Sequence, residues 1–124
     1  MERVGVIGLG NMGLGMAKNL QAKGFTLTVY DARQEPLGEM AALGACLAAS
    51  PRQVGQRSEV VFIMVLNGAQ VREVVSGKGG LLEGVRPGAT VICTATIERA
   101  VMIEVAAALE GRGIDVIDSP VSGG

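Results

Sequence analysis

Short apolar runs recur along the chain and alternate with segments of mixed polarity. Runs rich in Val, Ile and Leu are typical of buried parallel strands, and we predict strands at Val4–Gly8, Phe25–Tyr30, Ala45–Ala48, Val60–Leu66, Ala89–Cys93 and Ile114–Ile117. The segments between them predict helices at 12–23, 35–43, 51–57, 67–75 and 97–111, with a helical turn at 81–85. Strand and helix therefore alternate about six times, which predicts an α/β fold with a doubly wound parallel sheet.

The expected first helix shows the pattern most clearly. Met12, Met16 and Leu20 recur every four residues, with Ala17 beside them, and predict its buried face. Gly24 is placed to end this helix, and Ser50 to begin the short helix that ends near residue 57. These signals set the expected boundaries of the elements.

Composition narrows the class of protein. The 124 residues fit one domain, 48% are apolar, and the net charge is −1 without a basic cluster, which argues against nucleic-acid binding. There is no His, and we expect no metal site. The longest apolar run, Val60–Leu66, is too short to span a membrane. Cys46 and Cys93 form no C-x-x-C pair. We expect both to be buried, small apolar residues in a reducing compartment, and so a cytoplasmic protein.

A glycine-rich turn follows the first strand. Gly8, Gly10 and Gly13 fit G-x-G-x-x-G between a strand and a helix. In such a turn one glycine permits the sharp bend, one lets the backbone approach a pyrophosphate, and one lets helix and strand pack closely. We expect residues 8–13, that is Gly8, Leu9, Gly10, Asn11, Met12 and Gly13, to bind a dinucleotide at the helix N-terminus. The alternative is that these are only turn glycines.

Asp31 ends the second predicted strand, 18 residues after Gly13. Its carboxylate is expected to accept hydrogen bonds from the adenosine ribose hydroxyls, which favours NAD, and to repel the 2′-phosphate of NADP. Arg33 complicates this prediction because it can reach a 2′-phosphate. We expect it instead to be solvated or to cover the adenine. Lys78 is expected to be a solvated loop residue, because Gly77-Lys78 lacks the glycine of a P-loop.

Strand ends supply the other candidates, because the carboxyl ends of parallel strands line the ligand crevice. Val65 and Leu66 end one run and are expected to border the cofactor; the alternative is core and loop. Thr96 follows the next strand. We expect its hydroxyl to lie near the nicotinamide; the alternative is that Thr96 is a helix N-cap. The last strand is followed by the small residues Ser122, Gly123 and Gly124. Their N–H groups are suited to binding a carboxylate; the alternative is that they form a plain turn.

These motifs together resemble the β-hydroxyacid dehydrogenases, a family that includes 3-hydroxyisobutyrate dehydrogenase and 6-phosphogluconate dehydrogenase. Gly8-Leu9-Gly10-Asn11-Met12-Gly13 resembles the family's opening, Asp118-Ser119-Pro120-Val121-Ser122-Gly123-Gly124 its D-x-P-V-S-G-G signature, and Thr96-Ile97 part of its S-T-I segment. The resemblance implies a Rossmann-type NAD-binding domain over residues 1–124. It also implies cofactor contacts at Asp31, Val65, Leu66 and Thr96, and contacts to a 3-hydroxy acid at Ser122–Gly124. Asn67-Gly68-Ala69-Gln70 resembles the L-threonate dehydrogenase branch.

Two departures limit what the resemblance implies. The family's S-S-T-I-x-P is Thr94-Ala95-Thr96-Ile97-Glu98-Arg99 here, which changes the substrate contacts. The family's catalytic Lys lies in a later helix, before a helical domain that completes the pocket and a homo-oligomer. None of Lys18, Lys23 and Lys78 matches it, so we expect a truncated domain without turnover of its own. The alternatives are a non-catalytic nucleotide-binding module and an NADP-dependent imine-reductase-like enzyme.

Overall fold

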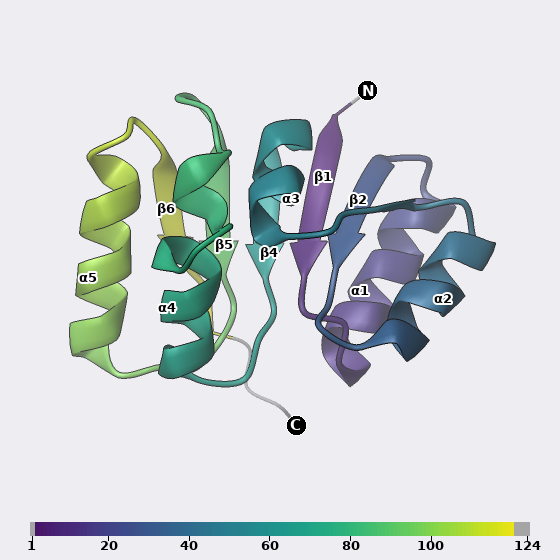
Figure 1. Ribbon diagram of the computed structural model, residues 1–124, viewed down its shortest axis with the longest axis horizontal. Coiled ribbons are helices and arrows are strands. Elements are labelled where there is room, and N and C mark those ends of the chain that lie inside the picture. The colour runs from purple at the N-terminus through teal and green to yellow at the C-terminus, as the bar shows by residue number, and fades with distance from the viewer. Residues whose placement is uncertain (1, 121–124) are drawn as a thin grey trace.

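A six-stranded parallel sheet forms the centre of the computed structural model, which describes residues 2–120 (Figure 1). Its strands are β1 (Arg3–Ile7), β2 (Thr26–Tyr30), β3 (Cys46–Leu47), β4 (Val60–Ile63), β5 (Thr90–Cys93) and β6 (Asp115–Asp118). Their order is β3-β2-β1-β4-β5-β6, and all neighbouring strands run parallel. This is the strand order of the dinucleotide-binding Rossmann fold, so the predicted fold class is confirmed.

Helices cover the two faces of the sheet unequally. They are α1 (Asn11–Ala22), α2 (Gln34–Ala42), α3 (Pro51–Arg57), α4 (Gly68–Ser76) and α5 (Arg99–Glu110), with a 3₁₀ turn at Leu81–Glu83. Buried residues of α1 and α2 share one cluster with β1 and β2, whereas those of α3, α4 and α5 share a second cluster with β4 and β5. Neighbouring residues of β1 supply the two clusters, because successive side chains point to opposite faces of the sheet; Val6 lies in the first and Ile7 in the second.

The helix boundaries follow the predicted signals. Ser50 caps α3 by accepting a hydrogen bond from the Gln53 N–H at 3.4 Å. Gly24 follows α1 with φ +88°, a conformation that suits glycine at a helix end. The N-cap of α5 is Glu98 rather than Thr96, because the helix begins two residues later than expected. The N-cap alternative for Thr96 is therefore wrong.

The buried face of α1 agrees with the prediction only in part. Ala17 is buried as predicted, and Met16 and Leu20 are partly buried. Met12 is 48% exposed, and Gly13 is buried against the sheet in its place. A Cβ on Gly13 would contact the carbonyl oxygen of Gly8 at the end of β1. The helix lies so close to the strand end that only small residues fit between them. Met12 lies one position before Gly13, off this contact face, and lines the smaller cleft.

The fourth strand is shorter than its apolar run. We predicted Val60–Leu66, but β4 ends at Ile63 and Leu66 is exposed. Both neighbouring strands stop at the same level, β1 at Ile7 and β5 at Cys93, so the ladder has no partner beyond Ile63. Met64 still donates its N–H to the Ile7 carbonyl at 2.7 Å before the chain leaves the sheet.

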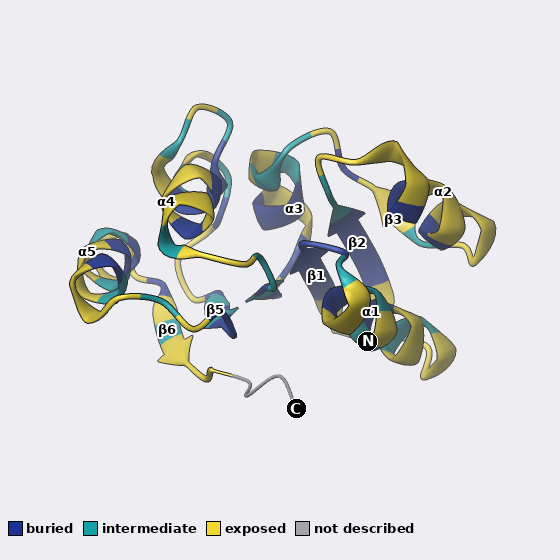
Figure 2. Ribbon diagram, turned by 90° about the horizontal axis from the view of Figure 1, so that it is seen from below, coloured by how far each residue is buried: buried dark blue, intermediate teal, exposed yellow. Residues whose placement is uncertain are grey.

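One cross-strand row shows where the helical cover stops. Val29, Val6, Phe62, Ile92 and Ile117 lie side by side in register across β2, β1, β4, β5 and β6. Val29 and Val6 are 0% exposed beneath α1 and α2, Phe62 and Ile92 are partly buried, and Ile117 is 48% exposed. In Figure 2, β6 at the edge of the sheet is coloured mostly yellow, the colour of exposed residues. On this face the helices of the described chain cover only half of the sheet.

Candidate functional site

The glycine turn is held between the ends of β1 and β4. Gly8 has φ +100°, donates its N–H to the Tyr30 carbonyl at 2.9 Å, and lies where a Cβ would be 2.6 Å from the Met64 carbonyl oxygen. Gly13 packs directly on the Gly8 carbonyl group. Neither position can take a side chain without displacing backbone, so the turn has one available shape.

Gly10 differs from the other two glycines of the motif. A Cβ at Gly10 would meet no protein atom within 4 Å, and its φ of −68° is ordinary for any residue. The fold therefore does not require glycine here. Gly10 is the N-cap of α1 and no side chain caps this helix end, so its first N–H groups and the positive end of the helix dipole face open space. This bare cradle fits the pyrophosphate of a dinucleotide.

Asp31 is anchored beside this turn. Its Oδ2 accepts the Leu9 N–H at 2.6 Å, and its Oδ1 accepts the Arg33 N–H at 2.8 Å. The Arg33 guanidinium adds two contacts, Nε to Oδ1 at 3.0 Å and Nη2 to Oδ2 at 3.2 Å. The Asp31 side chain is 9% exposed, whereas that of Arg33 is 63% exposed. The carboxylate is therefore fixed in the wall of the site and the guanidinium lies on its solvent side.

Two opposing effects act on the Asp31 carboxyl. Burial raises its pKa, but hydrogen bonds from the Arg33 side chain, the Leu9 N–H and the Arg33 N–H together outweigh burial, and the pKa lies below the ordinary value. The same contacts raise the pKa of the Arg33 guanidinium. Asp31 is consequently an anion throughout the neutral range and an acceptor only.

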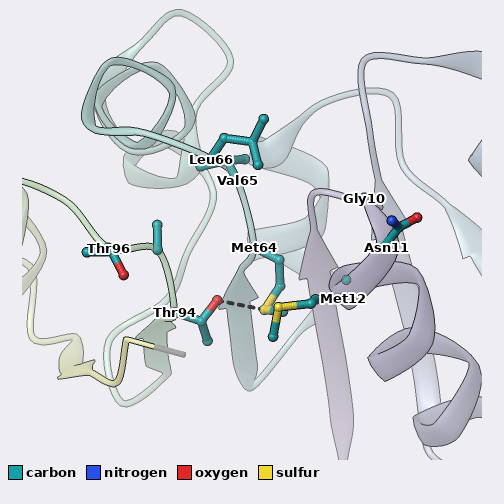
Figure 3. A pocket seen from close by; sticks show the side chains of 10 residues that line it. Gly10, Asn11, Met12, Met64, Val65, Leu66, Thr94 and Thr96 are labelled. Carbon is teal, nitrogen blue, oxygen red and sulfur yellow. Dashed lines mark hydrogen bonds between the residues drawn. The ribbon is translucent and has the colours of Figure 1, made fainter. Parts of the chain in front are cut away.

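Two adjoining clefts open at the carboxyl ends of the strands, where a parallel sheet places its ligands. The larger, of about 700 Å³, contains Asp31 and lies beside the glycine turn; its other lining residues include Gly8, Gly10, Tyr30, Arg33, Ser50, Val65, Gln70, Glu73 and Lys78. The smaller, of about 370 Å³, lies between the turn and the end of β5 (Figure 3). The two clefts share four lining residues, which form the boundary between them: Gly10, Met64, Val65 and Leu66.

Buried polar contacts fix the floor of the smaller cleft. The Thr94 hydroxyl lies 3.0 Å from the Ile63 carbonyl oxygen. It also lies 2.7 Å from the sulfur of Met64, the contact drawn as a dashed line in Figure 3. These contacts tie the end of β5 to the end of β4. Thr96 lies further out on the same wall and is exposed. The position suits a group that contacts a ligand in the cleft.

The structure brings together the predicted cofactor residues of the described chain. The larger cleft is lined by Gly8 and Asp31. The smaller cleft is lined by Asn11, Met12, Gly13 and Thr96. Both clefts are lined by Gly10, Val65 and Leu66. Leu9 lines neither cleft: its side chain is buried in the core, and it reaches the site through its N–H bond to Asp31. The predicted substrate residues Ser122, Gly123 and Gly124 lie outside the described residues.

Several lining residues were not among the predicted site residues. Met64 and Thr94 each directly follow a strand, a position that could have identified them. Gln70, Glu73 and Val74 have helical spacing and present one face of α4 to the larger cleft. Lys78 also lines the larger cleft, although we expected only a solvated loop residue.

Other features of the described chain are limited. Lys18 lies 3.5 Å from Glu39 on the surface, and among residues 2–120 no Lys lines the smaller cleft. No group of three or more Cys, Asp or Glu side chains within those residues is placed to hold a metal ion. None of the helices described is both long and apolar enough to cross a bilayer.

Comparison with known proteins identifies related sequences over almost the whole chain. A family model for the NAD binding domain of 6-phosphogluconate dehydrogenase matches residues 3–124. The mitochondrial 3-hydroxyisobutyrate dehydrogenase of Mus musculus is 39% identical over 121 residues, which are 98% of this chain and 36% of the mouse protein. The L-threonate dehydrogenase of Cupriavidus necator is 38% identical over 123 residues, 99% of this chain and 41% of that protein.

A solved structure shows the same arrangement. The 3-hydroxyisobutyrate dehydrogenase of Mycobacterium tuberculosis with L-serine is 31% identical and matches with a TM-score of 0.91 over 100% of this chain and 42% of its own. The present chain thus spans less than half the length of each of these relatives. The identities to the mouse and Cupriavidus proteins differ by one percentage point, so they favour neither branch.

Proposed function

The chain belongs to the family of 6-phosphogluconate dehydrogenase NAD-binding domains, and from this premise we propose that it is the cofactor-binding part of an NAD-dependent 3-hydroxy acid dehydrogenase. The mouse and Mycobacterium tuberculosis relatives are 3-hydroxyisobutyrate dehydrogenases, which supports the 3-hydroxy acid as the substrate class. The single observation that supports NAD over NADP is the Asp31 carboxylate, held 2.6 Å from the Leu9 N–H of the glycine turn.

In this proposal the two clefts hold the two halves of one cofactor. The adenosine ribose lies against Asp31 in the larger cleft, and the pyrophosphate meets the N–H groups at the start of α1 beside Gly10. The nicotinamide enters the smaller cleft between Met12 and Thr96. When bound, the nicotinamide supplies the hydride chemistry. The residues of this chain orient the cofactor and stabilise its charged groups.

The wall formed by β4 and β5 positions the reacting end. The Thr94 hydroxyl is used within the protein, on the Ile63 carbonyl and the Met64 sulfur, and keeps the floor of the smaller cleft in place. Two other polar side chains line this cleft: Asn11 at the glycine turn, and Thr96 on the β5 side, where it can contact the nicotinamide. Ser122, Gly123 and Gly124 belong to the proposal as contacts to the substrate carboxylate and hydroxyl, by their family motif.

The parent enzyme's setting is also part of the proposal. Cys46 and Cys93 are free and lie on β3 and β5, four strand spacings or about 19 Å apart, too far for a disulfide. This agrees with the expected reducing, cytoplasmic location. Assembly into a homo-oligomer through a further helical domain is proposed from family resemblance alone.

Calorimetric titration of the chain with NAD and NADP tests the proposal. We expect saturable NAD binding, weaker NADP binding, and no oxidation of 3-hydroxyisobutyrate because no lysine of the described chain lines the smaller cleft. Absence of NAD binding by a folded chain would contradict the cofactor assignment. Turnover by the 124 residues alone would contradict the proposed role as a binding part only.

A further inference from the structure

Arg33 fills the acceptor positions on Asp31 that a ribose needs. A carboxylate has about four lone-pair sites on its two oxygens. Oδ2 accepts from Leu9 N–H and Arg33 Nη2, and Oδ1 accepts from Arg33 N–H and Arg33 Nε. All four sites are therefore occupied by the protein itself. The two backbone donors hold the carboxylate in place, and the two guanidinium donors belong to an exposed side chain that lines the larger cleft together with Asp31.

A bound ribose must displace one pair of these donors. The Leu9 N–H belongs to the glycine turn and the Arg33 N–H to the backbone, so neither can leave without unfolding the site. The guanidinium is 63% exposed and can rotate away. Its departure frees one site on each oxygen, which matches the two hydroxyls of a ribose. We propose, on the basis of the function proposed above, that the Arg33 side chain competes with the ribose for Asp31 and sets the balance between NAD and NADP.

The same side chain acts in the opposite direction on NADP. Once displaced, the guanidinium remains tethered two residues from Asp31 at the rim of the larger cleft. Its planar fork suits a phosphate, and it would offset the repulsion between a 2′-phosphate and the Asp31 carboxylate beside it. Arg33 therefore weakens NAD binding and supports NADP binding. A residue with a merely structural role would change both affinities in the same direction.

Truncation of this side chain leaves the rest of the site intact. Arg33 is the N-cap of α2, but its side chain makes no capping hydrogen bond. In Arg33→Ala the backbone N–H at 2.8 Å and the Leu9 N–H at 2.6 Å still hold Asp31. Arg72→Ala is the matched control: Arg72 also forms an exposed pair, with Glu104 at 3.0 Å, and its loss changes the net charge equally without touching either cleft.

The test is calorimetric titration of the wild-type chain, Arg33→Ala and Arg72→Ala with NAD and NADP. We expect Arg33→Ala to bind NAD about two- to five-fold more tightly, the range for release of one exposed ion pair. It should bind NADP about five-fold more weakly, because a charge-assisted phosphate contact is lost. Arg72→Ala should match the wild type. The NAD advantage of Arg33→Ala should shrink as salt is raised, because salt screens the wild-type pair.

Each outcome separates this inference from the function on which it rests. If the wild type binds NAD and Arg33→Ala binds it equally or more weakly, Arg33 does not compete with the ribose, although the NAD assignment stands. A change in the same direction for both cofactors would also overturn it. No NAD binding by either protein would overturn the proposed function together with the inference. An equal gain in Arg72→Ala would show a general charge effect and would also overturn the inference.

Discussion

Three glycines in one short segment, Gly10, Gly13 and Gly15, separate the demands of folding from those of cofactor binding. A Cβ at Gly13 would contact the Gly8 carbonyl and lie 3.2 Å from the Met64 Cβ, whereas a Cβ at Gly10 or Gly15 would meet nothing within 4 Å. The same methyl group added at each position should therefore have three different effects. The perturbation is a set of three Gly→Ala variants.

The expected stabilities follow from helix physics and packing. Gly15→Ala adds a good helix former at an exposed position and should raise the free energy of unfolding by about 1 kcal/mol. Gly13→Ala should gain the same amount but pay an overpacking cost near 3 kcal/mol, because the obstacle is backbone, for a net loss of about 2 kcal/mol. Gly10→Ala loses about 0.7 kcal/mol as an N-cap and regains about as much from the unfolded state, so it should be nearly neutral.

The expected affinities differ from the stabilities. Gly10→Ala should bind NAD at least about ten-fold more weakly, because its methyl occupies the space through which the pyrophosphate approaches the helix end. Gly15→Ala should bind NAD like the wild type. Thermal unfolding, at about 4 °C per kcal/mol for a domain of this size, and NAD titration measure the two effects separately.

The outcome that would refute this reasoning is specific. Normal NAD affinity in Gly10→Ala would show that the pyrophosphate does not lie over Gly10. A Gly13→Ala variant as stable as the wild type would show that α1 can move away from β1 at little cost.

Three further predictions concern charge, thiol reactivity and the graded cover of the sheet. Asp31→Asn should weaken NAD by about ten-fold and reduce the discrimination against NADP, measured by titration. Because the folded pKa of Asp31 lies below 3.8, its stabilising contribution is present above that pH and is lost as pH falls below it, so wild type and Asp31→Asn should converge in acid unfolding curves. Cys93 is buried as predicted, and burial raises its pKa, but the prediction of a buried Cys46 is wrong, because Cys46 is exposed on the short strand β3. A thiol reagent should therefore modify one equivalent in the folded chain and two after unfolding. Val6→Ala should lower the free energy of unfolding, measured with denaturant, by about 2 kcal/mol, and Ile117→Ala should lower it by less than about 1 kcal/mol. Equal losses would show that these two residues of the same cross-strand row are not buried to different extents.

The sequence predicted those features whose constraints are local. The glycine turn, the spacing to Asp31 and the cap at Ser50 each depend on a few neighbouring residues, and their geometry agrees with the expectation. The alternation of strands and helices was likewise enough for the sheet class. Features of this kind follow from steric rules and hydrogen-bonding needs that act within one turn or one strand.

Other features depend on what lies opposite in space. The end of β4 at Ile63 is set by where β1 and β5 stop, which the apolar run to Leu66 does not encode. The face that α1 buries, Gly13 with Ala17, is set by how the helix lies against the end of β1, and this leaves Met12 exposed. The Arg33 contacts depend on the path of the chain after β2, because a spacing of two residues allows the side chain to point toward or away from Asp31.

The central place of β1 in the sheet also affects when the chain becomes able to bind. β1 is the first strand in chain order, yet its neighbours β2 and β4 begin at Thr26 and Val60, and the backbone that supports Gly8 belongs to Met64. Parallel neighbours need long crossovers, so these contacts close late and slowly compared with a hairpin. During synthesis the glycine turn and Asp31 emerge early, but the larger cleft that they line is complete only after β4 has joined β1.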